Sequence, residues 1–194
     1  MKVQNSETIA EFKLDLEEAE NNLRRNLHES ASSATWQAKP LTIEEVLQRF
    51  KEIVGKSRVR NLKSVWTLHP GTKCLHRLRN IVVLIKLKEF LQPEFCSFQD
   101  HGMTEAEKEH LNALGIVTPE FSDFSEERIE ESEDDVVDVY YMVYCNVLIM
   151  DNLLRNNWSI KAFKHLLLVH NLEHRSAYIS LMGLRTLLDD MLFH

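Results

Sequence analysis

Residues 140–158, YYMVYCNVLIMDNLLRNNW, have the pattern of a buried strand that turns directly into an amphipathic helix. The uninterrupted apolar start predicts a strand covered on both faces, and apolar residues at helical spacing follow it. In open parallel sheets, ligands bind outside the carboxyl ends of the strands. The stretch therefore predicts an α/β fold, and it places a candidate site at the turn between strand and helix.

Strand and helix patterns alternate on both sides of this stretch. Residues 61–68 (NLKSVWTL), 94–99 (EFCSFQ) and 163–171 (FKHLLLVHN) predict strands. Helices are predicted between them, and a capping box of Thr104 and Glu107 marks the start of one. Because such alternation implies crossover connections, we expect a three-layer, Rossmann-like α/β domain with a mostly parallel sheet over residues 39–194.

Residues 1–38 form a predicted extension, an amphipathic helix followed by a linker. Ser6 can cap the helix, and its apolar residues step by three or four positions, as in a heptad seam. The seam is too short for an autonomous coiled coil, so we expect it to fill a groove on a protein partner, on a second copy or on its own domain. Its residues are Ile9, Phe12, Leu16, Ala19 and Leu23.

Composition and charge exclude several classes of protein. The chain is 44% apolar with few Gly and Pro residues, which predicts folding, and its net charge of −7 gives no attraction to nucleic acid or to an anionic membrane. No run of residues is long and apolar enough to predict a membrane span or a signal peptide. Three cysteines, an odd number, agree with a reducing compartment, so we expect the cytoplasm, the nucleus or both.

Two charged stretches carry weaker signals. The acidic loop at about 121–136 is rich in Glu and Asp, and we expect it to be exposed and mobile. The basic run KSRVRNLK at 56–63 lacks interleaved aromatic residues, so a solvated face is favoured over nucleic-acid binding.

Several motifs follow one another over about residues 62–178. They include a strand end at Asp100, a helix that runs to Leu114, Gly115 and Ile116, a strand end with Met142 and Cys145, a helix with Leu153 and Leu154 that closes on Asn157 and Trp158, and a strand end with Asn171. This order resembles the sensitivity-to-red-light-reduced (SRR-like) family, which has an Asp-Pro strand end, a Thr-x-x-Glu helix running to Leu-Gly-Ile, a Met-Pro-His-Cys strand end, a helix closing on Asn-Trp and a Gly-Asn-Ser strand end. The resemblance implies a regulatory role, and it implies no established reaction.

The departures from the family pattern fall where a site would lie. The glycine-rich turn after the first strand is replaced by WTLHPG at 66–71, and Asp-Pro has become Asp100-His101. The histidine of Met-Pro-His-Cys is replaced by Tyr144, and Gly-Asn-Ser has become His170-Asn171-Leu172. The resemblance therefore implies that the architecture persists while the chemistry around it has changed.

Polar residues that follow the predicted strands are the candidate ligand contacts. They could converge on a metal, but because no two of them share a local ligand spacing, we expect neither a metal nor a cofactor. Lys73 lies near a helix N-terminus, which attracts anions, although a simple turn is favoured there. The candidates are His69, Lys73, Asp100, His101, Cys145, His170 and Asn171.

The sequence favours a noncatalytic regulatory or scaffold protein that acts through protein-protein interaction, with the N-terminal helix as docking element. The alternative is a small-molecule or nucleotide-binding enzyme that uses the strand ends, with Asp100 as general acid or base and Cys145 as a possible nucleophile. No histidine is adjacent to Cys145, so a buried, inert cysteine is favoured. Trp158 is expected to pack on the sheet.

Overall fold

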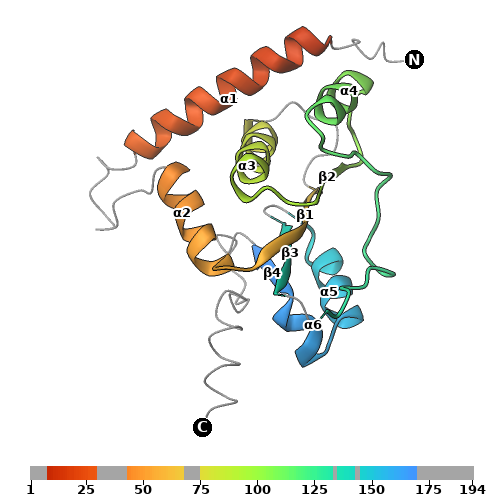
Figure 1. Ribbon diagram of the computed structural model, residues 1–194. Coiled ribbons are helices and arrows are strands. Elements are labelled where there is room, and N and C mark those ends of the chain that lie inside the picture. Colours follow the sequence, from red (N-terminus) through yellow and green to blue (C-terminus); the bar gives the residue numbers. More distant parts are fainter. Residues whose placement is uncertain (1–7, 30–42, 68–74, 133–134, 143–144, 170–194) are drawn as a thin grey trace.

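The structure is a computed structural model, and it describes residues 8–29, 43–67, 75–132, 135–142 and 145–169. Four parallel strands form one sheet in the order β2-β1-β3-β4, and helices cover both of its faces (Figure 1). The predicted α/β fold is confirmed. In chain order the elements are α1 (Ile9–Glu29), α2 (Ile43–Val54), β1 (Arg58–Trp66), α3 (Leu75–Leu91), β2 (Phe95–Asp100), α4 (Glu105–Ala113), β3 (Val136–Tyr141), α5 (Val147–Asn156), α6 (Ile160–Lys164) and β4 (Leu166–Val169).

Helices α1 to α4 share the core on one face of the sheet. Helix α3 packs on the sheet through fully buried residues such as Ile81 and Leu84, and α1 lies across α3 and α4 (Figure 1). The helix ends follow the expected chemistry. Thr104 and Glu107 form the predicted capping box of α4, and Gly115 takes a positive φ of 70° just beyond that helix.

Helix α1 is part of this core. The seam residues Phe12, Leu16 and Ala19 are buried, and Leu23 packs against the same cluster. The seam therefore lies on the chain's own domain, which is one of the three places predicted for it. The helix begins two residues later than a Ser6 cap would allow, because Thr8 makes the reciprocal hydrogen bonds with Glu11.

Helices α5 and α6 cover the opposite face together with residues 121–132, which we call the acidic strap (Figure 1). Most of its side chains are exposed, but Phe124 and Ile129 are buried in the core, so the prediction of an exposed loop fails at these two residues. The strap follows α4 in the long connection between β2 and β3. Apolar burial outweighs its acidic composition, since each buried side chain of this size contributes about 1.5–3 kcal/mol.

The acids of the strap bind cations on β1. The Lys63 amine donates to the Glu127 carboxylate, which also accepts from the Tyr140 hydroxyl at 2.7 Å. Arg60 donates to Glu130 at 2.8 Å and to the buried Asp138 at 2.6 Å. The basic run at 56–63 is therefore not only a solvated face, because two of its cations hold the strap on the sheet.

Asn157 holds the strap from the other side. Its buried side-chain amide accepts from the Ile129 amide at 2.7 Å and donates to the carbonyls of Glu127 at 3.1 Å and Leu153 at 2.8 Å. The Asn157 side chain thus joins the end of α5 to the backbone of the strap.

Replacing Asn157 with Ala is expected to lower the free energy of unfolding by about 2–3 kcal/mol, because a buried amide and two carbonyls lose their partner. Urea unfolding measures this loss. Asn152→Ala is the matched control, because Asn152 also donates a hydrogen bond to the strap, at the Asp123 carbonyl, but this hydrogen bond is exposed. A glutamate-specific protease should also cut the strap faster in the Asn157 variant. Equal behaviour of the two variants would show that Asn157 does not anchor the strap.

The predicted strand at 163–171 is shorter in the structure. Residues 160–164 form α6 instead, because the Ser159 side chain caps this helix by accepting from the Ala162 amide at 3.0 Å. Among the described residues the strand occupies Leu166–Val169, and residues 170 and 171 of the predicted strand lie outside the described part of the chain. Beside β2, Val117 forms an isolated parallel bridge with Ser97.

Candidate functional site

The sheet has one topological switch point, between β1 and β3. The chain leaves β1 toward β2 on one side and β3 toward β4 on the other, so the carboxyl ends of the two central strands border the crevice where such folds bind ligands. His69, Lys73, His170 and Asn171 lie outside the described residues. The other candidates are Asp100, His101 and Cys145.

Asp100 ends β2 and is bound within the protein. Its side chain is 0% exposed, and the Arg77 guanidinium in the first turns of α3 donates to Oδ2 at 2.5 Å. The Gly102 amide donates to Oδ1 at 3.0 Å. Because both oxygens are engaged and enclosed, the carboxylate has no open side from which to transfer a proton to a substrate.

Arg77 binds a second buried carboxylate. Glu107 on α4 accepts two hydrogen bonds from it, at 2.5 and 3.0 Å, and also accepts from the Thr104 amide at 2.8 Å in the capping box. Burial opposes the charge on Arg77, but Glu107 and Asp100 outweigh it and raise the pKa of the guanidinium. The cluster of Arg77, Asp100 and Glu107 thus locks α3, β2 and α4 together at the strand ends.

Cys145 lies at the switch point but is not poised for chemistry. Its thiol is buried, and burial raises its pKa to about 12, although hydrogen bonds with the Thr67 side chain and the Asn146 backbone act in the opposite direction. The Thr67 hydroxyl, just after β1, also accepts from the Asn146 amide at 2.6 Å. The described residues of the crevice are therefore neutral and bonded to one another across β1 and β3.

The two described cysteines are expected to react slowly with thiol reagents. Burial raises the pKa of Cys96 to about 12 as well, so at pH 7–8 both side chains remain thiols, which are poor nucleophiles. In a Cys74→Ser background, we expect modification by a disulfide reagent to be at least about tenfold slower in the folded than in the urea-unfolded chain, and to accelerate with pH beyond 9. A fast-reacting thiol at pH 7, absent from Cys145→Ser, would contradict this expectation.

His101, the remaining described candidate, lies at the surface. The exposed His101 ring stacks on Phe121, with ring centroids 3.5 Å apart, where the chain enters the strap.

Among the residues that the structure describes, no group of three His, Cys, Asp or Glu side chains could hold a metal ion. In the same part of the chain, none of the helices combines the length and the apolar character needed to cross a bilayer.

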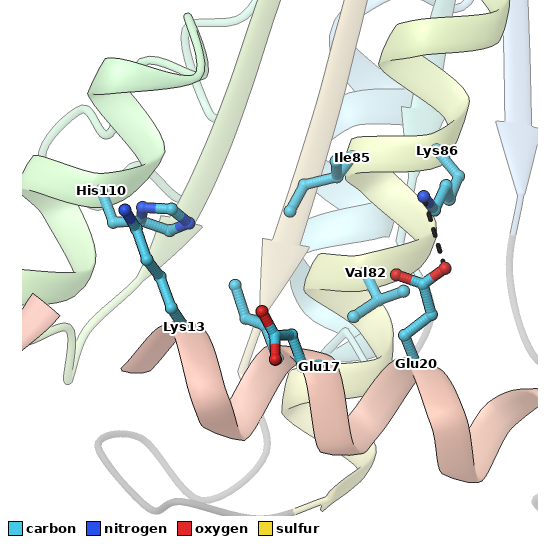
Figure 2. A pocket seen from close by; sticks show the side chains of 8 residues that line it. Lys13, Glu17, Glu20, Val82, Ile85, Lys86 and His110 are labelled. Carbon is cyan, nitrogen blue, oxygen red and sulfur yellow. Dashed lines mark ion pairs between the residues drawn. The ribbon is translucent and has the colours of Figure 1, made fainter. Parts of the chain in front are cut away.

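A groove of about 240 Å³ lies on the other side of the core, between α1, α3 and α4 (Figure 2). Leu16 from α1 and Val82 and Ile85 from α3 give it apolar walls. Its remaining lining residues are charged or titratable: Lys13, Glu17, Glu20, Lys86 and His110. Reasoning from the sequence missed this groove, because nothing in the seam pattern shows which residues of α3 and α4 will meet α1.

The charges along the groove are unevenly paired. At one end, the Glu20 carboxylate binds Arg24 at 2.9 Å and Lys86 at 3.4 Å, and these contacts lower its pKa against the effect of burial. At the other end, Lys13 extends toward the His110 ring (Figure 2). Burial and the nearby Lys13 charge both lower the pKa of His110.

Trp158 does not pack on the sheet, so that prediction is wrong. The residue is 73% exposed, and its indole makes a T-shaped contact with the Phe163 ring, at 5.3 Å between centroids. The preceding Asn157 turns inward to hold the strap, and this leaves the next side chain pointing outward. Trp66, at the end of β1, is buried.

Comparison with known proteins identifies one family. No curated protein matches the chain, and no solved structure does. The family model of the SRR1 domain matches residues 78–178, just over half of the chain, from α3 through β4 and beyond. This range contains Asp100, Glu107, Cys145 and Asn157, which bind within the protein. The chain belongs to the SRR1 domain family.

Proposed function

We propose that this SRR1-domain chain acts without catalysis, as a regulatory or scaffold protein that binds other proteins in the cytoplasm or nucleus. The observation that carries the proposal is the state of Asp100. The one described carboxylate at a strand end is enclosed by Arg77 and the Gly102 amide, so it serves the fold. A general acid or base needs hydrogen-bond access to its substrate.

The thiol at the switch point supports the same proposal. Cys145 has a raised pKa and no described histidine beside it, so it lacks the activation that a nucleophilic cysteine needs. The rival function, a small-molecule or nucleotide-binding enzyme, would have to rely on residues beyond Asp100 and Cys145.

The N-terminal helix remains the proposed docking element, through a different side than the seam. Because Phe12, Leu16 and Ala19 are buried against α3 and α4, a protein partner or a second copy would meet the outer surface of α1 and the groove beside it. Helix surfaces with an adjoining apolar groove are a recurrent mode of recognition between proteins.

Equilibrium binding tests the noncatalytic part of the proposal. The purified chain is titrated with Mg²⁺, Zn²⁺ and a panel of nucleotides and dinucleotides, alone and with each metal present. We expect no saturable binding. Saturable binding that is lost in Thr67→Ala or Cys145→Ser, with thermal unfolding unchanged, would overturn the proposal in favour of a ligand site at the switch point.

A further inference from the structure

We propose that the groove between α1, α3 and α4 receives a segment of a protein partner, which places a large apolar side chain on the groove's apolar walls and an acidic side chain against Lys13 and His110. This inference rests on the proposed function and adds the surface and the chemistry of the partner. Figure 2 shows the two sides of the groove, with Lys13 and His110 together at one end.

The size of the groove favours a side chain over a cofactor. Its volume is about 240 Å³. Pockets for drug-sized ligands and cofactors span about 300–1,000 Å³, whereas a buried cavity of about 150 Å³ is enough to hold benzene. The groove therefore has room for one aromatic or large aliphatic side chain, which would contact Leu16, Val82 and Ile85.

The charges of the groove indicate which residue of the partner should lie beside its apolar side chain. Lys13 and His110 stand together, and among the described residues neither has a carboxylate within ion-pair distance. Lys86 is already bound to Glu20 at the far end. An acid of the partner thus finds its complement at the His110 end, where Lys13 supplies the positive charge and the His110 imidazole lies beside it.

Glu17 restricts where along the groove the partner's acidic side chain can lie. It lies on α1 between Lys13 and Glu20, one turn from each, and it lines the groove with them. If the partner bound one helical turn further along α1, its acidic side chain would face the Glu17 carboxylate. Repulsion between these like charges disfavours that position. The partner segment should therefore carry its acid on one side of the apolar residue.

Selection from a phage-displayed library of random 12-residue peptides, with the full chain as target, tests the inference. We expect the enriched peptides to share an acidic residue within two positions of a large apolar residue. Lys13→Glu should weaken their binding by about tenfold and should replace the acid with Lys or Arg in a new selection. Lys164→Glu, which makes the same charge change on the exposed surface of α6, should leave the binding unchanged.

A second variant fills the groove without a change of charge. Ile85→Trp places an indole where the partner side chain would lie, and Ile85 is only partly buried, so the helix can accept the larger residue. Its thermal unfolding and that of Lys13→Glu should match the wild type within a few degrees. Enriched peptides that lack the acid-apolar pair, or that bind both variants as well as wild type, would overturn the inference.

Complexes purified from the protein's own cells separate this inference from the proposed function. A protein partner that copurifies with the wild type and with both variants would show that the groove is not its binding site, and the proposed function would still stand. A doubled mass that Lys13→Glu abolishes would place a second copy in the groove instead of a foreign segment. No protein partner for the wild type would count against the proposed function itself.

Discussion

Replacing Arg77 with Met is expected to lower the free energy of unfolding by about 3–5 kcal/mol, because the carboxylates of Asp100 and Glu107 would remain buried without their cation. This is a large part of the stability of a typical domain, about 5–15 kcal/mol. Chemical denaturation followed by circular dichroism measures the loss. The methionine keeps the apolar stem of the side chain, so the effect reports the charge.

The control for Arg77 is an arginine with the same partner chemistry at the surface. Arg155 binds Asp151 at 2.6 Å within α5, and both side chains are exposed, so Arg155→Met should cost no more than about 0.5 kcal/mol. Adding Asp100→Asn and Glu107→Gln to Arg77→Met should recover part of the loss, because no charge then remains buried. A loss below about 1 kcal/mol in Arg77→Met would mean that Asp100 is accessible, and it would revive the enzyme hypothesis.

Replacing Phe12 with Ala is expected to destabilise the chain by about 3–5 kcal/mol, although the residue lies in an N-terminal helix before the sheet. Phe12 is fully buried, and its ring meets the His110 imidazole edge-on at 5.6 Å, so its loss opens a cavity between α1 and α4. Chemical denaturation of the full chain provides the measurement.

Leu14→Ala is the matched control for Phe12, two residues along the same helix. Leu14 is 63% exposed, so its replacement should change stability by less than about 0.5 kcal/mol. A small effect in both variants would show that α1 does not belong to the core. In that case the seam would be free for a partner, and the groove would not exist as described.

Periodic and local patterns predicted much of the fold. The seam that begins at Ile9 has the spacing of a buried helix face, and α1 buries that face. Thr104 and Glu107 are three residues apart, so their capping box could be read from the sequence. The apolar strand cores predicted a sheet covered on both faces, which the two core clusters confirm.

The ion pairs that the sequence did not predict join residues that are far apart in the chain. Arg77 meets Asp100 and Glu107 across 23 and 30 residues, and Lys63 meets Glu127 across 64. No local spacing predicts such pairs, so composition alone suggested a solvated strap. Phe124 and Ile129, two large apolar residues among acids, were the available signal that the strap is buried in part.

Trp158 shows the limit of reading a motif as packing. Asn157 and Trp158 are adjacent and both match the family pattern, yet one side chain is buried and the other exposed. Which of two neighbours points inward depends on the φ and ψ angles at the end of α5, and the sequence does not show them. The interior role belongs to Asn157, which supplies three hydrogen bonds to the backbone.

Native mass spectrometry of the full chain, purified gently from its own cells, tests the central claim most directly, namely that the protein acts by binding proteins and not by chemistry at its strand ends. We predict a mass that exceeds 22.7 kDa by that of a whole protein chain. Lys13→Glu should remove the added mass, and Cys145→Ser should retain it. An added mass of only a few hundred daltons, lost in Cys145→Ser, would contradict the account and place a ligand at the switch point.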